Sequence, residues 1–255
     1  MTRTLVLIAG ASFVLAVACL SGAGALGWNA ARHHHWDNWN IRLGDDHDWR
    51  FIGHESRTID DAGSGATATR ELTWNGGDSL DIGLPAKVRF TQAPGPAKLV
   101  VTGPKDEVDH IVLSGSQLRF DDDGDYDGPL TVTLTAPDVR HFGISGAADL
   151  AIAGYAQDDL DIDVSGSGTV TAAGKAKSVK LDISGDGNVD LGGLATDSAE
   201  AEISGSGKAA LAPANAADLH ISGDGEIDLK SHPAKLNSDV SGSGRIVEGD
   251  EVKSS

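Results

Sequence analysis

The sequence predicts an all-β fold: a single-stranded parallel β-helix, or β-solenoid, with coils of about 19 residues and a less regular N-terminal β region. Three observations predict it. An apolar residue followed by Ser-Gly recurs six times between Ile144 and Ile246. The chain between these copies alternates apolar and polar residues, and no Phe, Trp or Tyr follows Tyr155. The serines of the six copies are spaced by 20, 19, 20, 18 and 19 residues, at Ser145, Ser165, Ser184, Ser204, Ser222 and Ser241.

Each repeat is expected to form one coil, which buries its apolar face by stacking on its neighbours. Runs such as Leu160–Val164 and Val179–Ile183 alternate apolar and polar residues before a Ser-Gly corner, which indicates strands. A coil of ~19 residues has room for about three strands of three to five residues. Glycine suits the corners because it adopts positive φ without steric cost. A β-sandwich is the alternative, but its strands do not return at a near-constant period, so the solenoid is favoured.

The corners predict a polar ladder along one edge of the solenoid. From Ser165 onward, Ser-Gly-Ser-Gly alternates with Ser-Gly-Asp-Gly, which places Asp186 and Asp224 two coils apart. Aspartates on adjacent coils, about 4.8 Å apart, would repel by about 0.9 kcal/mol even in bulk water. We therefore expect a structural ladder along this edge, in which each aspartate lies between the hydroxyls of Ser167, Ser206 or Ser243 on the adjacent coils. Its predicted members are Ser165, Ser184, Ser204, Ser222, Ser241, Asp186 and Asp224.

Residues 1–26 are expected to direct export. An uncharged and largely apolar stretch follows Arg3, and Ala23-Gly-Ala25 fits a signal-peptidase site. Ala16-Val-Ala-Cys19 is a weaker lipid-anchor site, and the stretch is also long enough to remain as a membrane anchor. All three alternatives predict an exported protein. Cys19 is the only cysteine, so no disulfide can form within the chain.

Residues 27–57 are predicted to form a polar linker that is rich in tryptophan and histidine. Tryptophans beside an apolar segment can lie at a membrane interface, and neutral imidazoles can bind a transition metal. A solvated tether without metal is the favoured interpretation. The residues concerned are Trp28, Trp36, Trp39, Trp49, His33, His34, His35, His47 and His54.

Residues 58–140 keep the β pattern but lose the period. Short apolar runs such as Lys98–Thr102 and Leu130–Leu134 are separated by Gly, Pro and Asp turns. Atypical coils are expected at the end of a solenoid, because an open end exposes unpaired strand edges. We interpret this region as irregular coils with an N-terminal cap. Regular repeats then cover 141–249, and the polar tail 250–255 is expected to shield the other end.

One acidic segment is a candidate calcium site. Asp123-Gly-Asp-Tyr-Asp-Gly128 matches the opening of a calcium loop, in which alternating aspartates precede a glycine bend. The twelfth position is Leu134 instead of glutamate, and a strand follows, so this is not an EF-hand. An acidic turn without calcium is the alternative, and no other cofactor is predicted. The predicted ligands are Asp121, Asp123, Asp125 and Asp127.

The composition argues against nucleic-acid partners. The chain has 38 acidic and 20 basic residues and a net charge of −18, whereas nucleic acids and anionic lipids bind basic patches. Any membrane contact is therefore expected to involve only the N-terminal segment.

The motifs argue against catalysis. The sequence contains no nucleophile elbow, zinc-protease motif or phosphate-binding loop. His141, His220 and His232 are isolated in sequence and are expected to be surface or stacked residues. Aspartates such as Asp161 and Asp163 can line a saccharide groove, but they equally suit the solvent side of an alternating strand. The sequence therefore predicts that the protein is not an enzyme.

The serial corners, together with the strand Leu130–Pro137 that ends in proline, resemble the bacterial family called putative auto-transporter adhesin, head GIN domain. The similarity covers roughly residues 80–249. The resemblance implies a right-handed parallel β-helix, export to the periplasm, outer membrane or cell surface, and a role in adhesion. It supplies no catalytic residues.

We therefore expect a non-catalytic, exported interaction module of the cell envelope, similar to an adhesin head. Its expected partner is an envelope or surface protein or glycan. A periplasmic scaffold tethered by its N-terminus is one alternative. A polysaccharide-active β-helix enzyme is the other, and it is less favoured.

Overall fold

The computed structural model describes residues 66–126 and 128–249, which belong to one compact unit, Asp60–Ser255. The predicted leader, linker and tail (1–26, 27–57 and 250–255) lie outside the described residues. The described part consists mainly of strands, with one short helix, α2 (Lys105–Asp109). Within these ranges, no helix has the length and apolar content that a membrane crossing needs.

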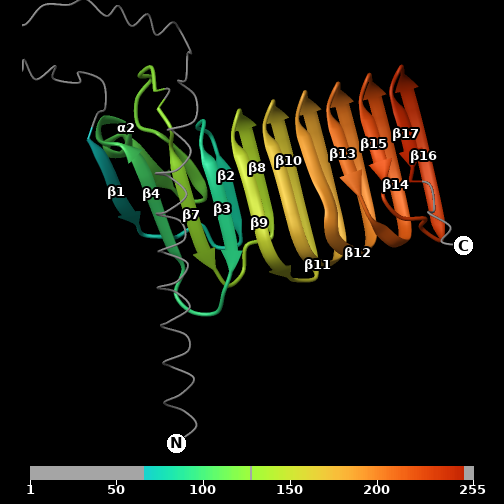
Figure 1. The fold of residues 1–255 in the computed structure, drawn as a ribbon, viewed down its shortest axis with the longest axis horizontal. Helices are drawn as coiled ribbons and strands as arrows, with labels where there is room; N and C mark the ends of the chain where they lie inside the picture. Colours follow the sequence, from blue (N-terminus) through green and yellow to red (C-terminus); the bar gives the residue numbers. More distant parts are fainter. Residues whose placement is uncertain (1–65, 127, 250–255) are drawn as a thin grey trace, which may run out of the picture. The chain divides into compact units, whose positions relative to one another are not determined.

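The strands wind into stacked coils that form two facing sheets (Figure 1). The first sheet holds the strands that precede the Ser-Gly corners, together with three strands of the N-terminal region, which come first in the stack. In stacking order they are β5 (Ile111–Ser114), β6 (Gln117–Phe120), β2 (Ser79–Ile82), β8 (His141–Gly146), β10 (Asp159–Gly166), the second halves of β11 (Thr169–Gly185) and β12 (Asn188–Gly205), β14 (Pro213–Gly223) and β16 (Lys235–Gly242).

The second sheet holds the strands that follow the corners. In stacking order they are β1 (Thr67–Leu72), β4 (Lys98–Pro104), β7 (Thr131–Ala136), β3 (Lys87–Gln92), β9 (Asp149–Ala156), the first halves of β11 and β12, β13 (Lys208–Leu211), β15 (Glu226–Leu229) and β17 (Arg245–Glu248). Because β11 and β12 run from one sheet into the other, hydrogen bonds join all 17 described strands into one network.

The predicted all-β solenoid is confirmed, and its regular coils stack in parallel register. Ser165 pairs with Ser184, and Ser184 with Ser204, so each corner lies directly on the one before. The regular coils have fewer strands than the three short ones expected from the sequence, and several of their strands are longer. The 17-residue β11 shows why. Its backbone stays hydrogen-bonded to the neighbouring coils where it passes from one sheet to the other, with only a register shift near Ala172.

The core between the sheets is built from stacked aliphatic side chains. Leu160, Ile162 and Val164 are buried in β10, and they pair in register with buried residues of β11. Burying each such side chain contributes roughly 1.5–3 kcal/mol. The aromatic part of the core lies in the N-terminal coils, where the rings of Phe90 and Phe142 meet edge to face at 5.1 Å.

The first glycine of the regular corners is required by both backbone conformation and space. Gly166 has φ 118°, in the region that favours glycine. A Cβ at Gly166 would also lie 2.8 Å from the backbone oxygen of Gly146 on the preceding coil. Gly146 itself has φ 113°, but a Cβ there would meet nothing within 4 Å. Close contact between the glycines of successive Ser-Gly corners therefore begins at Gly166, in the second of the six corners.

The N-terminal coils do not stack in chain order. The coil formed by β2 and β3 pairs on one side with β6 and β7, and on the other side with β8 and β9. After β3 the chain passes through β4, α2 and β5, forms the outermost parallel coil with β6 and β7, and then returns to β8. Antiparallel strands close this end, because β4 pairs antiparallel with β7 and β5 with β6 (Figure 1).

The C-terminal coil, formed by β16 and β17, ends the stack of described residues. All eight residues of β16 are exposed, including Leu236 at 37 % and Val240 at 40 %. Polar residues occupy some of its inward positions: Ser238 lies in register with the buried Leu219, and Glu248 with the buried Leu229.

Candidate functional site

Outward side chains of the first sheet form columns that run from coil to coil. We call one of them the acidic column, because five of its seven positions carry a carboxylate. Its members, in register, are Asp81, Gly143, Asp163, Asp182, Glu202, His220 and Asp239. The neighbouring column, which we call the mixed column, contains Ser79, His141, Asp161, Lys180, Glu200, Asp218 and Asn237.

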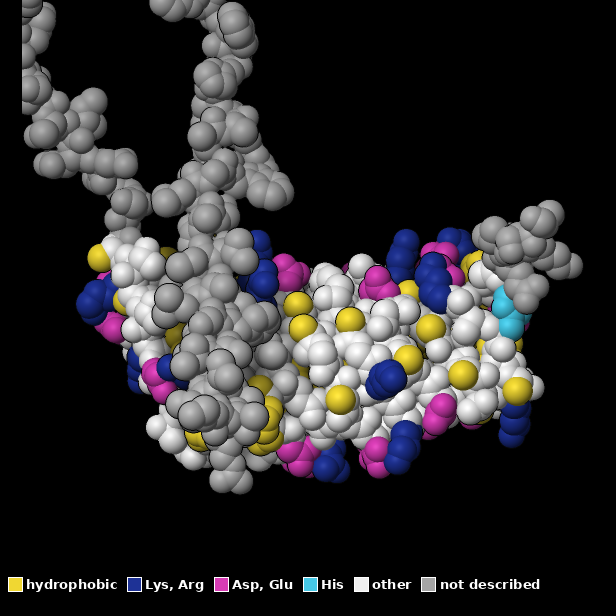
Figure 2. Space-filling view, turned by 60° about the horizontal axis from the view of Figure 1, so that its bottom comes forward, with side chains coloured by type: hydrophobic (Ala, Val, Ile, Leu, Met, Phe, Trp, Pro, Cys, Tyr) yellow, Lys and Arg dark blue, Asp and Glu magenta, His cyan; other side chains and the backbone are white. Residues whose placement is uncertain are grey.

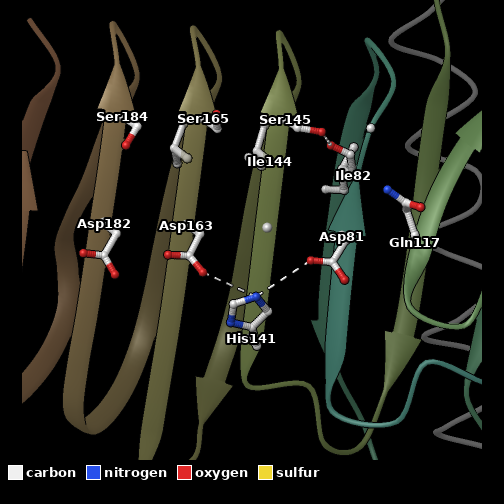
Figure 3. A pocket seen from close by; sticks show the side chains of 13 residues that line it. Asp81, Ile82, Gln117, His141, Ile144, Ser145, Asp163, Ser165, Asp182 and Ser184 are labelled. Carbon is white, nitrogen blue, oxygen red and sulfur yellow. Dashed lines mark hydrogen bonds and ion pairs between the residues drawn. The ribbon is translucent and has the colours of Figure 1, made fainter. Parts of the chain in front are cut away.

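Gly143 interrupts the acidic column and leaves a hollow of about 510 Å³ in the surface of the first sheet. Side chains from β6, β2, β8, β10 and β11 surround the hollow (Figure 3). A Cβ at Gly143 would lie 2.5 Å from Oδ1 of Asp81, so any side chain there would displace this carboxylate. The gap in the column therefore gives the carboxylates on either side room to approach one another.

The imidazole of His141 lies in this gap between three carboxylates. Its Nε2 is 3.5 Å from Oδ2 of Asp163 and 3.8 Å from Oδ1 of Asp81, which flank the ring on opposite sides (Figure 3). Its Nδ1 is 3.4 Å from Oδ2 of Asp161. These distances exceed those of ordinary hydrogen bonds, so the groups are close together without being tightly bonded.

The carboxylates around His141 differ in their hydrogen bonding and burial. Oδ2 of Asp81 accepts hydrogen bonds from Oγ of Ser116 at 2.5 Å and Oγ of Ser79 at 3.3 Å, which leaves Oδ1 facing His141. Oδ1 of Asp161 is buried and has no hydrogen-bond partner in the part of the chain that the structure describes. Burial raises the pKa of Asp163, and the negative charge of Asp161 adds to the effect. The cluster therefore concentrates negative charge at a half-buried position.

Comparison with known proteins identifies the family. The family model described as "Putative auto-transporter adhesin, head GIN domain" matches residues 72–233, which is well over half of the chain. The chain belongs to this family. A comparison with curated proteins finds no match.

One solved structure shows the same fold as this chain, and two others resemble it more weakly. A putative adhesin from Bacteroides fragilis is 23% identical with a TM-score of 0.59, and the match covers 73% of this chain and 98% of that one. A putative adhesin from Parabacteroides merdae is 17% identical with a TM-score of 0.44, covering 74% and 98%. A putative lipid binding protein from Parabacteroides distasonis is 18% identical with a TM-score of 0.42, covering 74% and 98%.

The candidate calcium ligands of this GIN-domain protein lie in the corner between β6 and β7. Asp121, Asp123 and Asp125 are exposed there, and Asp127 lies outside the described residues. Asp121 Oδ1 is 3.0 Å from Nδ1 of His110, and this contact raises the pKa of the histidine. Calcium binding at these aspartates stays a prediction.

Tyr126 anchors the same acidic corner by a hydrogen bond and a ring contact. Its hydroxyl donates a hydrogen bond to Oδ1 of Asp122 at 2.7 Å, and its ring stacks on Phe120 with centroids 4.2 Å apart. Desolvation and the neighbouring Asp122 carboxylate raise the pKa of Tyr126 to about 12. The tyrosine therefore connects the tip of this corner to the strand β6.

The residues of the predicted corner ladder lie on successive coils. The first serines pair in register along the sheet, and the amide of Asp186 donates to the carbonyl of Gly166 on the coil before. All the predicted members are exposed. Within residues 66–126 and 128–249 no hydrogen bond joins two of these side chains, so any ladder effect is electrostatic. That effect stays a prediction.

Sequence analysis did not find the cluster around His141. One signal was available: His141 and Asp161 each lie four residues before the serine of their corner, so the repeat register places them side by side. Asp81 belongs to β2, which precedes the Ser-Gly repeats, and its place in the stack follows only from the structure.

Proposed function

We propose that this protein is a non-catalytic interaction module of the bacterial cell envelope, similar to an adhesin head. Its membership of the GIN-domain family carries the proposal, because both the family and the B. fragilis structure bear the name "putative adhesin" or "putative auto-transporter adhesin". The proposed partner is a protein or glycan of the envelope or of another surface. Export through the N-terminal segment is part of the same proposal.

The surface of the solenoid suits repeated polar contacts. Outward side chains recur at each coil, so one partner can make similar contacts on several coils at once. On the face seen in Figure 2, hydrophobic side chains are scattered, and Lys, Arg, Asp and Glu lie between them. A partner that recognises this face would use many small contacts in place of one apolar patch.

Protease shaving of intact cells tests the proposal. An antibody against the regular repeats reports whether the solenoid is cleaved from whole cells, and cell fractionation locates the remainder. Cleavage on intact cells is the expected result for a surface module. Protection until the outer membrane is opened would favour the alternative, a periplasmic scaffold tethered by its N-terminus. A cytoplasmic protein, released only on lysis, would overturn the proposal.

A further inference from the structure

We propose that His141, Asp81 and Asp163 form a binding site for a divalent transition-metal ion, with Asp161 orienting the histidine. The site lies on the first sheet at the gap left by Gly143. It is independent of the proposed adhesive role and of the candidate calcium loop.

The distances around His141 suit ligands of one ion better than hydrogen bonds. Nitrogen and oxygen atoms joined by a hydrogen bond or a close ion pair usually lie about 2.7–3.2 Å apart. Two ligands that each lie about 2.1 Å from a metal are about 3.0–3.4 Å from each other, in octahedral or tetrahedral geometry. The Nε2–Asp163 separation of 3.5 Å and the Nε2–Asp81 separation of 3.8 Å are close to this spacing. Atoms of His141, Asp161 and Asp163 that could hold an ion already lie within 4.8 Å of one another, whereas Asp81, on the other side of the ring from Asp163, would have to move inward to join them.

The gap at Gly143 lets the ligands close on an ion. Asp81 and Asp163 come from coils on either side of β8 and flank the ring of His141 (Figure 3). Because Gly143 has no side chain, both carboxylates can move inward above its backbone. A residue with a Cβ at this position would collide with Asp81 at 2.5 Å.

Two of the three ligands, His141 and Asp81, have a partner that orients them, as metal ligands usually do. Asp161 Oδ2 lies 3.4 Å from Nδ1 of His141, so it favours the tautomer with the proton on Nδ1. The lone pair of Nε2 then faces the gap. Ser79 and Ser116 hold Oδ2 of Asp81 and leave Oδ1 directed at the same gap.

The charge of the cluster calls for a cation. Three carboxylates, those of Asp81, Asp161 and Asp163, surround one imidazole. Lys180 follows Asp161 in the mixed column, but its Nζ pairs with Asp182 at 2.6 Å. A divalent ion would offset two of these three negative charges. The imidazole ligand favours ions such as Zn²⁺ over Ca²⁺, which takes oxygen ligands.

A metal bound here would join three consecutive coils. Asp81 is in β2, His141 in β8 and Asp163 in β10, so the ion would connect the out-of-order coil of β2 and β3 to the regular repeats. Ligands distant in sequence and brought together only by folding stabilise the folded state when they bind.

Zinc binding to the metal-stripped full-length chain tests the proposal, with stoichiometry measured by equilibrium dialysis and stability by thermal unfolding. We expect His141→Gln to bind one Zn²⁺ fewer than the wild type. We also expect saturating Zn²⁺ to raise the wild-type Tm by about 5 °C more than that of the variant. His220→Gln, in the acidic column, is the matched control and keeps both values. The linker histidines are the same in all variants, so any zinc bound there cancels in the comparison.

Equal stoichiometry and equal Tm shifts in the wild type and His141→Gln would overturn the proposal. So would a Tm shift with Ca²⁺ and none with Zn²⁺, because Ca²⁺ does not select an imidazole. Circular dichroism in the absence of metal shows whether each variant is folded. If His141→Gln does not fold, Asp163→Asn decides between the outcomes, because it removes one ligand and also relieves the burial of a charge.

Discussion

The two ends of the described solenoid are finished in different ways. At the N-terminal end, the antiparallel strands β1, β4 and β5 and the helix α2 flank the first parallel coils, and the largest core side chains, including Phe90, Phe142 and Tyr155, lie in the coils that follow. At the C-terminal end, β16 and β17 continue the parallel stack, and Ser238 and Glu248 replace core leucines. Antiparallel strands and a helix therefore cover the N-terminal end, whereas the C-terminal end is an ordinary coil in which polar residues replace core leucines.

This difference predicts unequal stability along the array, as in other repeat proteins. Phe142→Ala removes a fully buried ring at the N-terminal end and is expected to cost about 3–5 kcal/mol of unfolding free energy. Leu236→Ala, at 37 % exposure in β16, is expected to cost less than about 1 kcal/mol. Urea denaturation of both variants measures the costs. Equal costs would show that the C-terminal coil is packed as firmly as the N-terminal ones.

Glycine substitutions sharpen the comparison between the first corner and the regular ones. Gly146→Ala meets only the cost of positive φ, about 1–3 kcal/mol. Gly166→Ala adds a clash with the backbone of the preceding coil at 2.8 Å, so we expect the larger loss of stability, by about 1–2 kcal/mol. Thermal unfolding of the two variants checks the order, and the reverse order would contradict the stacking of the corners.

The corner ladder provides a smaller effect. Ser206→Asp places a carboxylate on the coil between those of Asp186 and Asp224, so we expect a loss of about 1–2 kcal/mol that is partly recovered in high salt. Ala147→Asp is the matched control, because its neighbour on the next coil is Ser167. Tm values at low and high salt provide the measurement. If the Ser206→Asp protein is as stable as the Ala147→Asp control, the predicted electrostatic ladder does not exist.

The smallest expected effect concerns Asp163 and pH. The pKa of Asp163 is raised by burial and by Asp161, so the folded state binds this proton more tightly than the unfolded chain does. The folded state therefore loses stability as the pH rises from below the ordinary value of 3.8 through the raised pKa. Asp163→Asn removes this loss, so the metal-free variant is expected to be slightly more stable at neutral pH. Tm measured against pH for both proteins checks it, and identical curves would contradict it.

The regular coils were predictable because one motif marks each of them. The Ser-Gly corners fix the period, and the alternation of runs such as Leu160–Val164 fixes which side chains face the core. The order of the N-terminal coils was not predictable, because β2 and β6 carry no such corner. Nothing in their sequences shows that β2 lies between β6 and β8.

The cluster around His141 was predictable in part. The repeat register pairs His141 with Asp161 and Gly143 with Asp163, so half of the site follows from counting residues. The contribution of Asp81, and the room that Gly143 leaves for it, depend on contacts between segments about 60 residues apart. Periodicity carries no information on contacts of that kind.

The exchange of coil order at the N-terminal end has a consequence for the time course of folding. The strands of the regular coils pair with segments about 18 to 20 residues away in sequence. In contrast, Leu80 pairs with Phe142 and Lys87 with Asp149, each about 60 residues away. Contacts of such long range form slowly. A chain that is synthesised N-terminus first can therefore pair β3 with β7 early, but it completes the stack around β2 and β3 only when β8 and β9 have been made. The C-terminal repeats can then add one by one to an edge that is already in place.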